Sequence, residues 1–389
     1  MFRQSISAMV LLAAGVQAAT IHVPGDLPTI QAGIDAASKG DVVEVAPGTF
    51  GEKLNFHGKA IEVRGAGPGL SIVDPRLGSS GKARVVTFSE QEKSSSVLSG
   101  FTLTQGYIGV FGNGTGGGIF CFGSSPTITD CAISNNRAGQ GAGIACVRAS
   151  PRISNCTISG NHNGSGIDCH DGSSPRISNC TIDNHRSAHG AGIGSYHSSP
   201  TISNCTITSN TADLSGGGIY CLNSLTTIRH CIITNNSASE FGGGGVDITE
   251  QWRGASSVKI FNCTVANNDG GDGDKSGGIL DSTDGTNIIN SIIFDNTPHQ
   301  IEGDPTVSFS SVEGETRWPG NGNVNADPRF RTYRNFDYVL GPASPCIDAG
   351  TGNDDGIDWG SIHPAYGDIN SARPDMGAYG GPGASSWLR

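Results

Sequence analysis

Residues 143–161 read GIACVRASPRISNCTISGN, residues 166–184 read GIDCHDGSSPRISNCTIDN and residues 192–210 read GIGSYHSSPTISNCTITSN. Each copy holds three short Ile-centred runs, which are separated by a Ser-Pro turn and by a single Asn. Runs this short are too small to form a stable sheet alone, so each copy must stack on the next one. The unit therefore predicts a solenoid in which equivalent residues of successive copies lie above one another.

The same unit extends in both directions along the chain. The Ile or Val of its first run recurs, by subtraction of residue numbers, at steps of 23 to 33 residues: Ile119, Ile144, Ile167, Ile193, Ile219, Val246 and Ile279. The bend before the third run is occupied mostly by residues that tolerate a left-handed backbone: Gly100, Asp130, Asn155, Asn179, Asn204, His230, Asn262 and Asn290. Three strands per coil predict an all-β, single-stranded right-handed parallel β-helix of about ten coils. A leucine-rich repeat, the alternative with a similar period, needs repeated Leu and a helical segment.

Composition excludes several other classes of protein. Gly makes up 59 of the 389 residues, but these glycines cluster and do not recur at every third position, which excludes collagen. The formal net charge of −11 argues against a nucleic-acid partner.

The ends of the chain carry different signals. Residues 1–19 contain one basic residue, an apolar run and a small-residue exit, which is typical of a secretory signal peptide. No run reaches the roughly 20 apolar residues that span a membrane. We expect a monomer that is secreted or held at the cell surface. Residues 20–297 are expected to form the β-helix, with a capping helix within Pro28–Ser38, and residues 298–389 an irregular C-terminal cap.

Ten of the eleven cysteines fall in two columns of the predicted coil. One column is Cys131, Cys156, Cys180, Cys205, Cys231 and Cys263, and the other is Cys121, Cys146, Cys169 and Cys221, with Ser195 in the gap. Stacked side chains point in parallel, which places their β-carbons beyond the usual range of an unstrained disulfide. Packed free thiols are favoured, and a few strained or cross-core bridges are the alternative that export would support.

Three segments resemble a known family. The run from Ile30 to Phe50 and the closing segments 344–350 and 374–380 are similar to those of secreted right-handed parallel β-helix repeat proteins of the pectate lyase-like superfamily. The resemblance spans nearly the whole mature chain and implies this fold. The superfamily includes polysaccharide lyases, glycoside hydrolases, epimerases and adhesins, so the resemblance implies an extracellular polysaccharide or cell-surface glycan as partner without fixing an activity. No catalytic motif of a named subfamily is present.

Members of that superfamily usually bind glycans on the sheet that corresponds to the Gly-Ile-x-Cys run. Strand alternation turns every second residue of this run outward. The expected substrate-binding residues on or beside this face are Phe120, Phe122, Tyr220, Asp247 and His197. Stacking on sugar rings would explain aromatic residues there, and packing beneath the long loops is the alternative. The loop histidines His162, His185 and His189 would border the same face.

Three residues of this face form a candidate catalytic centre. Asp168 and His170 lie two residues apart, and Tyr196 aligns with His170 on the next coil. In a lyase, His170 or Tyr196 would remove the proton beside a uronate carboxylate and the other would protonate the leaving oxygen, with Asp168 orienting the imidazole. The alternative is a surface trio without catalytic role. Asp168 and Asp247 are three coils apart, too far for the carboxylate pair of a hydrolase.

Calcium is the one cofactor that the sequence suggests. Asp269, Asp272 and Asp274 offer hard oxygen ligands on flexible glycines, and so does the segment 353–358. Neither matches a complete calcium-binding loop, so acidic turns are the alternative. The leading hypothesis is a secreted, polysaccharide-interacting protein with a lyase-like activity. The competing hypothesis is a non-enzymatic cell-surface or adhesin-type protein, in which the coils are a rigid spacer.

Overall fold

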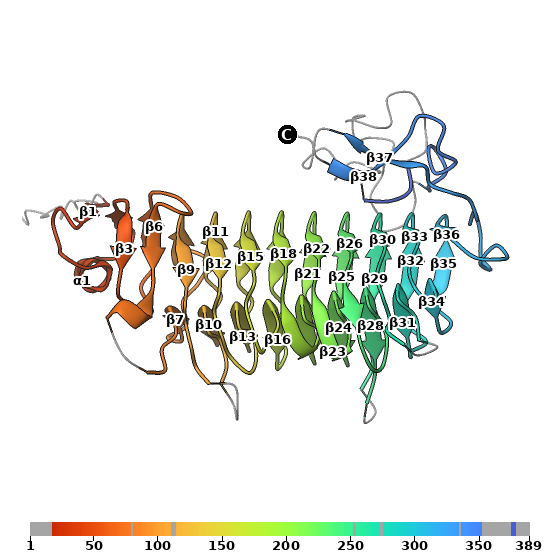
Figure 1. The fold of residues 1–389 in the computed structure, drawn as a ribbon. Coiled ribbons are helices and arrows are strands. Elements are labelled where there is room, and N and C mark those ends of the chain that lie inside the picture. The colour runs from red at the N-terminus through yellow and green to blue at the C-terminus, as the bar shows by residue number, and fades with distance from the viewer. Residues whose placement is uncertain are drawn as a thin grey trace, which may run out of the picture.

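The computed structural model describes residues 18–78, 81–109, 114–251, 254–272, 275–333, 336–351 and 375–378. Its main body is a long stack of coils, each of which contributes short strands to parallel sheets that run the length of the molecule (Figure 1). Three sheets, here called A, B and C, contain twelve, eleven and ten strands. The right-handed parallel β-helix expected from the sequence is confirmed.

The strands follow one another in the order A, B, C in each regular coil. Sheet A comprises β1 (Thr20–Val23), β2 (Val42–Val45), β5 (Glu62–Gly65), β8 (Val97–Ser99), β11 (Thr127–Thr129), β14 (Arg152–Ser154), β17 (Arg176–Ser178), β21 (Thr201–Ser203), β25 (Thr227–Arg229), β29 (Lys259–Phe261), β32 (Asn287–Ile289) and β35 (Thr306–Ser308). Sheet B comprises β3 (Gly48–Phe50), β6 (Ser71–Val73), β9 (Thr102–Thr104), β12 (Ala132–Ser134), β15 (Thr157–Ser159), β18 (Thr181–Asp183), β22 (Thr206–Thr208), β26 (Ile232–Thr234), β30 (Thr264–Ala266), β33 (Ile292–Phe294) and β36 (Ser311–Val312).

Sheet C carries the Gly-Ile-x-Cys runs. It comprises β4 (Leu54–Asn55), β7 (Val86–Phe88), β10 (Ile119–Phe122), β13 (Ile144–Val147), β16 (Ile167–His170), β20 (Ile193–Tyr196), β24 (Ile219–Leu222), β28 (Val246–Thr249), β31 (Ile279–Asp281) and β34 (Ile301–Glu302). A small fourth sheet in the loops before sheet C comprises β19 (Arg186–His189), β23 (Thr211–Ser215) and β27 (Ser237–Ala238), and a short 3-10 helix covers Pro75–Leu77.

The core is built from columns of identical or similar side chains. Cys121 pairs in register with Cys146, and Cys146 with Cys169, so the predicted thiol columns are present. All eleven cysteines are buried and free. The Ile residues of the three runs are fully buried beside them, as alternation requires.

Sharp corners separate the strands. Every predicted corner before a sheet B strand from Gly100 to Asn290 has a positive φ between 49° and 75°. Two further columns of corners follow sheets B and C, for example Asn135 at φ 56° and Asp171 at φ 56°. Asn, Asp and Gly occupy most of these positions because a left-handed backbone costs them least.

A ladder of buried amides follows the corner after sheet B. Asn136 Nδ2 donates to Asn161 Oδ1 at 3.0 Å, and Asn210 Nδ2 donates to Asn236 Oδ1 at 2.9 Å. His185 takes the place of Asn in one coil, where its Nδ1 accepts from the Asn161 N–H at 3.1 Å and its Nε2 faces the Ile158 carbonyl at 2.9 Å. A neutral imidazole satisfies both contacts, and burial lowers the pKa of His185 to about 4.

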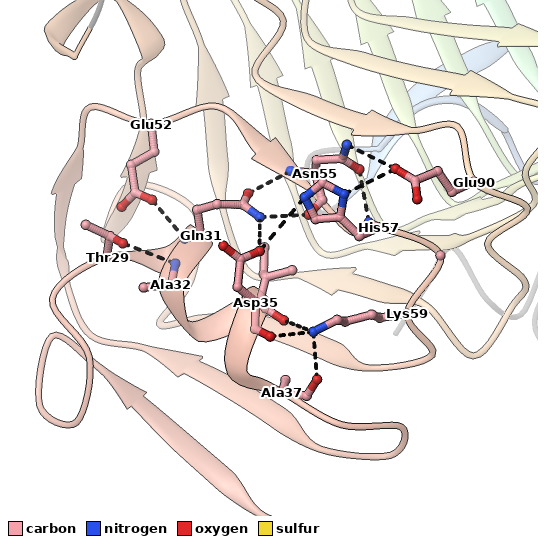
Figure 2. Close-up of polar contacts among 12 residues, drawn as sticks. Thr29, Gln31, Ala32, Asp35, Ala37, Glu52, Asn55, His57, Lys59 and Glu90 are labelled. Carbon is pink, nitrogen blue, oxygen red and sulfur yellow. Dashed lines mark hydrogen bonds and ion pairs between the residues drawn. The ribbon is translucent and has the colours of Figure 1, made fainter.

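The predicted capping helix is α1 (Ile30–Ala36), which buries Ile30 and Ile34 against the first coil. Side chains of the neighbouring coil hold both of its ends (Figure 2). Glu52 accepts from the first two helical N–H groups at 2.9 and 2.8 Å, and Lys59 Nζ donates to three carbonyls at the C-terminal end. These opposite charges complement the helix dipole, so α1 is fixed as a lid over the apolar core.

The C-terminal segment departs from the expected cap. Sheets A, B and C continue past residue 297 to Val312, so the expected boundary falls inside the solenoid. The hairpin of β37 (Phe330–Tyr333) and β38 (Phe336–Leu340) then lies against the side of the stack near β26 and β30 (Figure 1). There Asn267 Nδ2 donates to the Tyr338 hydroxyl at 2.8 Å, and the same hydroxyl contacts Thr234.

The expected signal peptide lies almost wholly outside the described residues, which begin at residue 18. Among the described residues, no helix is both long and apolar enough to cross a bilayer.

The native His185, which stands where other coils have Asn in the amide ladder, predicts that the stability of the fold falls in acid. Unfolding frees His185 to take up a proton near its ordinary pKa of 6.5, whereas the folded form resists protonation down to about pH 4. Stability is therefore unaffected above about pH 6.5 and falls as the pH drops toward 4, by about 3 kcal/mol for this group. Denaturant unfolding should be measured for wild type and His185→Asn at about pH 6.5 and about pH 4. The free energy of unfolding should fall less between these pH values in the variant than in wild type. His299→Asn, at an exposed histidine, is the control. Equal acid-induced losses of stability in wild type and His185→Asn would refute the assignment.

The thiol columns predict a titration result. In the native protein a thiol reagent should find almost no reactive cysteine, because all eleven are buried and burial raises the pKa of Cys221 to about 12. After denaturation without reductant, all eleven should react. A lower count that rises on reduction would reveal disulfides and contradict the packing of free thiols.

Candidate functional site

The outward face of sheet C has two columns of side chains, and the first is largely covered. Its members are Phe120, Ala145, Asp168, Gly194, Tyr220 and Asp247, of which all but Phe120 are buried. The loop before each strand folds back onto this column. Gly216 and Gly243 have φ of 67° and 68°, and a β-carbon on them would lie 2.8 and 2.6 Å from the β-carbons of Tyr220 and Asp247. Tyr220 and Asp247 are therefore packed beneath loops, and their expected exposure is not found.

The second column remains accessible. It consists of Phe122, Val147, His170, Tyr196, Leu222 and Thr249, none of which is fully buried. Phe122 is 38% exposed and has the Arg148 guanidinium 4.6 Å from its ring centre, while Arg84 lies 4.2 Å from the ring centre of Phe120. The second column thus offers the Phe122 ring with the Arg148 cation beside it, and Arg84 lies over Phe120 of the first column.

The structure brings the predicted catalytic trio together at the junction of the two columns. His170 Nε2 lies 3.7 Å from Asp168 Oδ2, an ion-pair distance longer than a hydrogen bond. The His170 ring stacks on Tyr196, with centroids 4.6 Å apart and ring planes 4° apart. Gly194 makes room for this arrangement, because a β-carbon there would lie 2.2 Å from Asp168 Oδ1. Tyr196 therefore contacts His170 through its ring face.

Two polar atoms of the trio stand out. Asp168 Oδ2 accepts from the Gly141 N–H at 2.8 Å, but Asp168 Oδ1 and His170 Nε2 are buried and have no hydrogen-bond partner within the described part of the chain. Buried polar groups nearly always have a partner, so each such atom requires an explanation. A polar group of a bound ligand would satisfy both atoms.

The electrostatics of the trio distinguish the roles of its members. Burial opposes protonation of His170, but the Asp168 carboxylate outweighs burial and raises the pKa of His170 above its ordinary value. Burial, reinforced by the charge of Asp168, raises the pKa of Tyr196 well above 10. Tyr196 is therefore a neutral phenol, which can donate a proton but cannot act as a base near neutral pH. Of these two residues, His170 is the one whose neutral form can accept a proton near neutral pH.

The cluster continues on the next coils. The Tyr196 and Tyr220 ring centres lie 5.6 Å apart, and His189 stacks on Tyr220 at 4.9 Å. His189 Nδ1 lies 3.1 Å from Ser215 Oγ. Burial raises the pKa of Asp247 to about 7, although a hydrogen bond from Ser215 acts in the opposite direction and lowers it. The position of Ser215 beside His189 could not be predicted from the repeat, because the register shifts by one residue where β19 pairs with β23.

The remaining predicted residues lie elsewhere. His197 is an exposed corner residue at φ 50°, and its Nε2 is 3.1 Å from the Asn223 amide of the next coil. Asp269 Oδ1 accepts from the Gly271 N–H at 2.9 Å in a local turn, and Asp272 is exposed. Asp274 and the segment 353–358 lie outside the described residues. Within the described ranges, no three His, Cys, Asp or Glu side chains are placed to hold a metal ion.

Comparisons with known proteins bear on the fold. Residues 86–231 match the family model described as a right handed beta helix region. The structure of pectate lyase Pel9A is similar over 94% of this chain and 97% of that chain, with a TM-score of 0.60 and 14% sequence identity. A structure of the PL6 family alginate lyase AlyGC covers 90% of this chain and 60% of that one, with a TM-score of 0.48 and 16% identity. No curated protein matches the sequence.

Removal of the Asp168 charge should reverse the direction in which the pKa of His170 is shifted. In Asp168→Asn, burial is opposed only by the weaker influence of Asp171, so the pKa of His170 should fall from above 6.5 to below that value. An NMR titration of the imidazole C–H signals measures this change. Asp171→Asn is the matched control, since Asp171 is exposed and is the weakest of the influences on His170. An unchanged His170 pKa in Asp168→Asn would show that the ion pair does not form.

Proposed function

We propose that this right-handed parallel β-helix, whose fold is similar to that of pectate lyase Pel9A, binds an extracellular polysaccharide along the outward face of sheet C and cleaves it there as a lyase. The observation that carries this proposal is the Asp168–His170 ion pair beneath Tyr196, with two buried polar atoms left for a ligand. The accessible second column supplies ring faces on which sugars stack.

The chemistry that suits these groups is β-elimination on a uronate unit. Neutral His170 removes the proton from the carbon beside the uronate carboxylate, and a double bond forms between that carbon and its neighbour. The glycosidic C–O bond at the neighbour breaks, and the Tyr196 hydroxyl protonates the leaving oxygen. Asp168 holds the imidazolium that results. No water is consumed, and the proton taken by His170 returns through solvent to Tyr196.

The substrate carboxylate needs positive charge nearby, since the developing carbanion spreads onto it. Arg148 and Arg84 lie over the neighbouring aromatic rings of the same sheet. Calcium held by the acidic turn at Asp269 and Asp272 would lie four coils along the stack from the His170 coil. It is therefore proposed to contact another unit of the bound chain, and assays with and without calcium test this role.

A non-enzymatic surface or adhesin-type role is the second candidate. Sheet C keeps its register without a break from β10 to β28, and the His170 and Asp168 side chains are only 18% and 4% exposed. A regular, closely packed face suits binding without turnover.

An ultraviolet assay for the unsaturated product tests the lyase on a panel of uronate-containing glycans. His170→Ala should reduce the rate about 10²- to 10⁴-fold, and Tyr196→Phe should reduce it while keeping the stacked ring. The wild-type rate should rise with pH as His170 loses its proton, and this limb should move to lower pH in Asp168→Asn. Asp171→Asn should retain the rate. Binding without product on any glycan would favour the non-enzymatic role, and full activity in His170→Ala would exclude this centre.

A further inference from the structure

A basic groove lies apart from the trio, at the start of the loops that lead from sheet B to sheet C. It comprises two hollows of about 770 and 370 Å³ that share His162. Volumes of this size are typical of small-ligand sites. The residues that the following argument uses are Tyr107, Asn135, Arg137, His162, Asn163 and Arg186.

Four of the groove side chains form a column of their own. Tyr107 pairs in register with Arg137, Arg137 with His162, and His162 with Arg186. Adjacent members therefore start from backbone positions about 4.8 Å apart, one coil after another. Beyond Arg186 the column continues with uncharged Thr211, so the basic character is confined to these coils.

Arg137 is the charge at the centre of this column. Arg186 is paired with Asp213 at 2.8 Å, and the Arg76 guanidinium on the rim is paired with Asp74 at 3.3 Å. Among the described residues, the partners of Arg137 are uncharged: its Nε donates to Asn163 Oδ1 at 2.9 Å, and its guanidinium lies 5.9 Å from the centre of the Tyr107 ring. Arg137 thus presents a positive charge in a chain whose net charge is −11.

The hydrogen bond to Asn163 also orients the Arg137 guanidinium. The Nε contact with Asn163 leaves the two terminal amino groups to face a ligand, and a fork of this kind binds carboxylate or sulfate oxygens in pairs. A group held before binding loses less conformational entropy on binding. Tyr107, which is 37% exposed, adds a ring beside this fork.

We propose that this groove binds an acidic sugar unit, with the carboxylate or sulfate on Arg137, the sugar ring beside Tyr107, and the sugar hydroxyls near His162 and the Asn135 amide. The overall negative charge disfavours a densely charged polyanion, so the ligand is an oligosaccharide with isolated acidic groups. The proposal extends the glycan-binding function to a second site and does not depend on the chemistry at His170.

Isothermal titration calorimetry at low salt tests the groove with three probes: trigalacturonate, sulfated maltotriose and unmodified maltotriose. The anionic probes separate a carboxylate ligand from a sulfate ligand, and the neutral probe should not bind. Arg137→Gln should weaken binding of the preferred anionic probe at least about tenfold, and Arg137→Lys should recover only part of it. Arg152→Gln, at an exposed arginine of the next coil on sheet A, is the matched control and should change affinity less than about twofold.

The groove assignment is overturned if neither anionic probe binds, or if Arg137→Gln and Arg152→Gln weaken binding equally. His170→Ala reports on the proposed lyase centre separately and should leave groove affinity unchanged. Loss of turnover in His170→Ala, with binding that still depends on Arg137, is the result expected of two separate sites. Absence of turnover in the wild type, with binding that still depends on Arg137, would remove the lyase proposal and leave the groove in place.

Discussion

Backbone hydrogen bonding between coils in exact register is the constraint on which the rest of this molecule depends. Because successive coils lie one strand spacing apart, each side chain lies between the equivalent side chains of the coils above and below it. A polar group can then find its partner in the next coil, as the Asn136 amide does with Asn161. The same register sets the Tyr196 ring flat against His170, although the two residues are 26 positions apart by subtraction.

The loops decide how much of this regular face is available to a ligand. Glycines such as Gly216 bring the backbone down onto the first outward column, and the polar side chains of that column become buried. Buried carboxylates such as Asp247 acquire raised pKa values, because their charged form loses water. An accessible column that includes the Phe122, His170 and Tyr196 rings then lies beside buried groups such as Asp247. The proposed function places polysaccharide binding and proton transfer at this boundary.

Periodicity was sufficient to predict the sheets, the thiol columns, the corners and the helix α1, because these features repeat or follow a simple apolar spacing. It was also sufficient to bring Asp168, His170 and Tyr196 together. Exposure was not predictable in the same way, since the burial of Tyr220 and Asp247 depends on loop paths that vary in length. The column from Tyr107 to Arg186 was missed for a related reason. Its four members, Tyr107, Arg137, His162 and Arg186, follow no single residue pattern and lie in those same loops, so only the backbone bridges reveal their alignment.

The hairpin of β37 and β38 has a consequence for how the protein resists force. In a solenoid each coil contacts only its neighbours, so unfolding under force is expected to begin at the terminal coil. Here Tyr338 reaches Thr234 and Asn267, while the backbone of Gly377 and Ala378 bonds to Asn290 and Thr264. These contacts tie several coils to one external strap. The final coils must therefore peel away together, which gives this end of the molecule a mechanical strength that stacking alone does not provide.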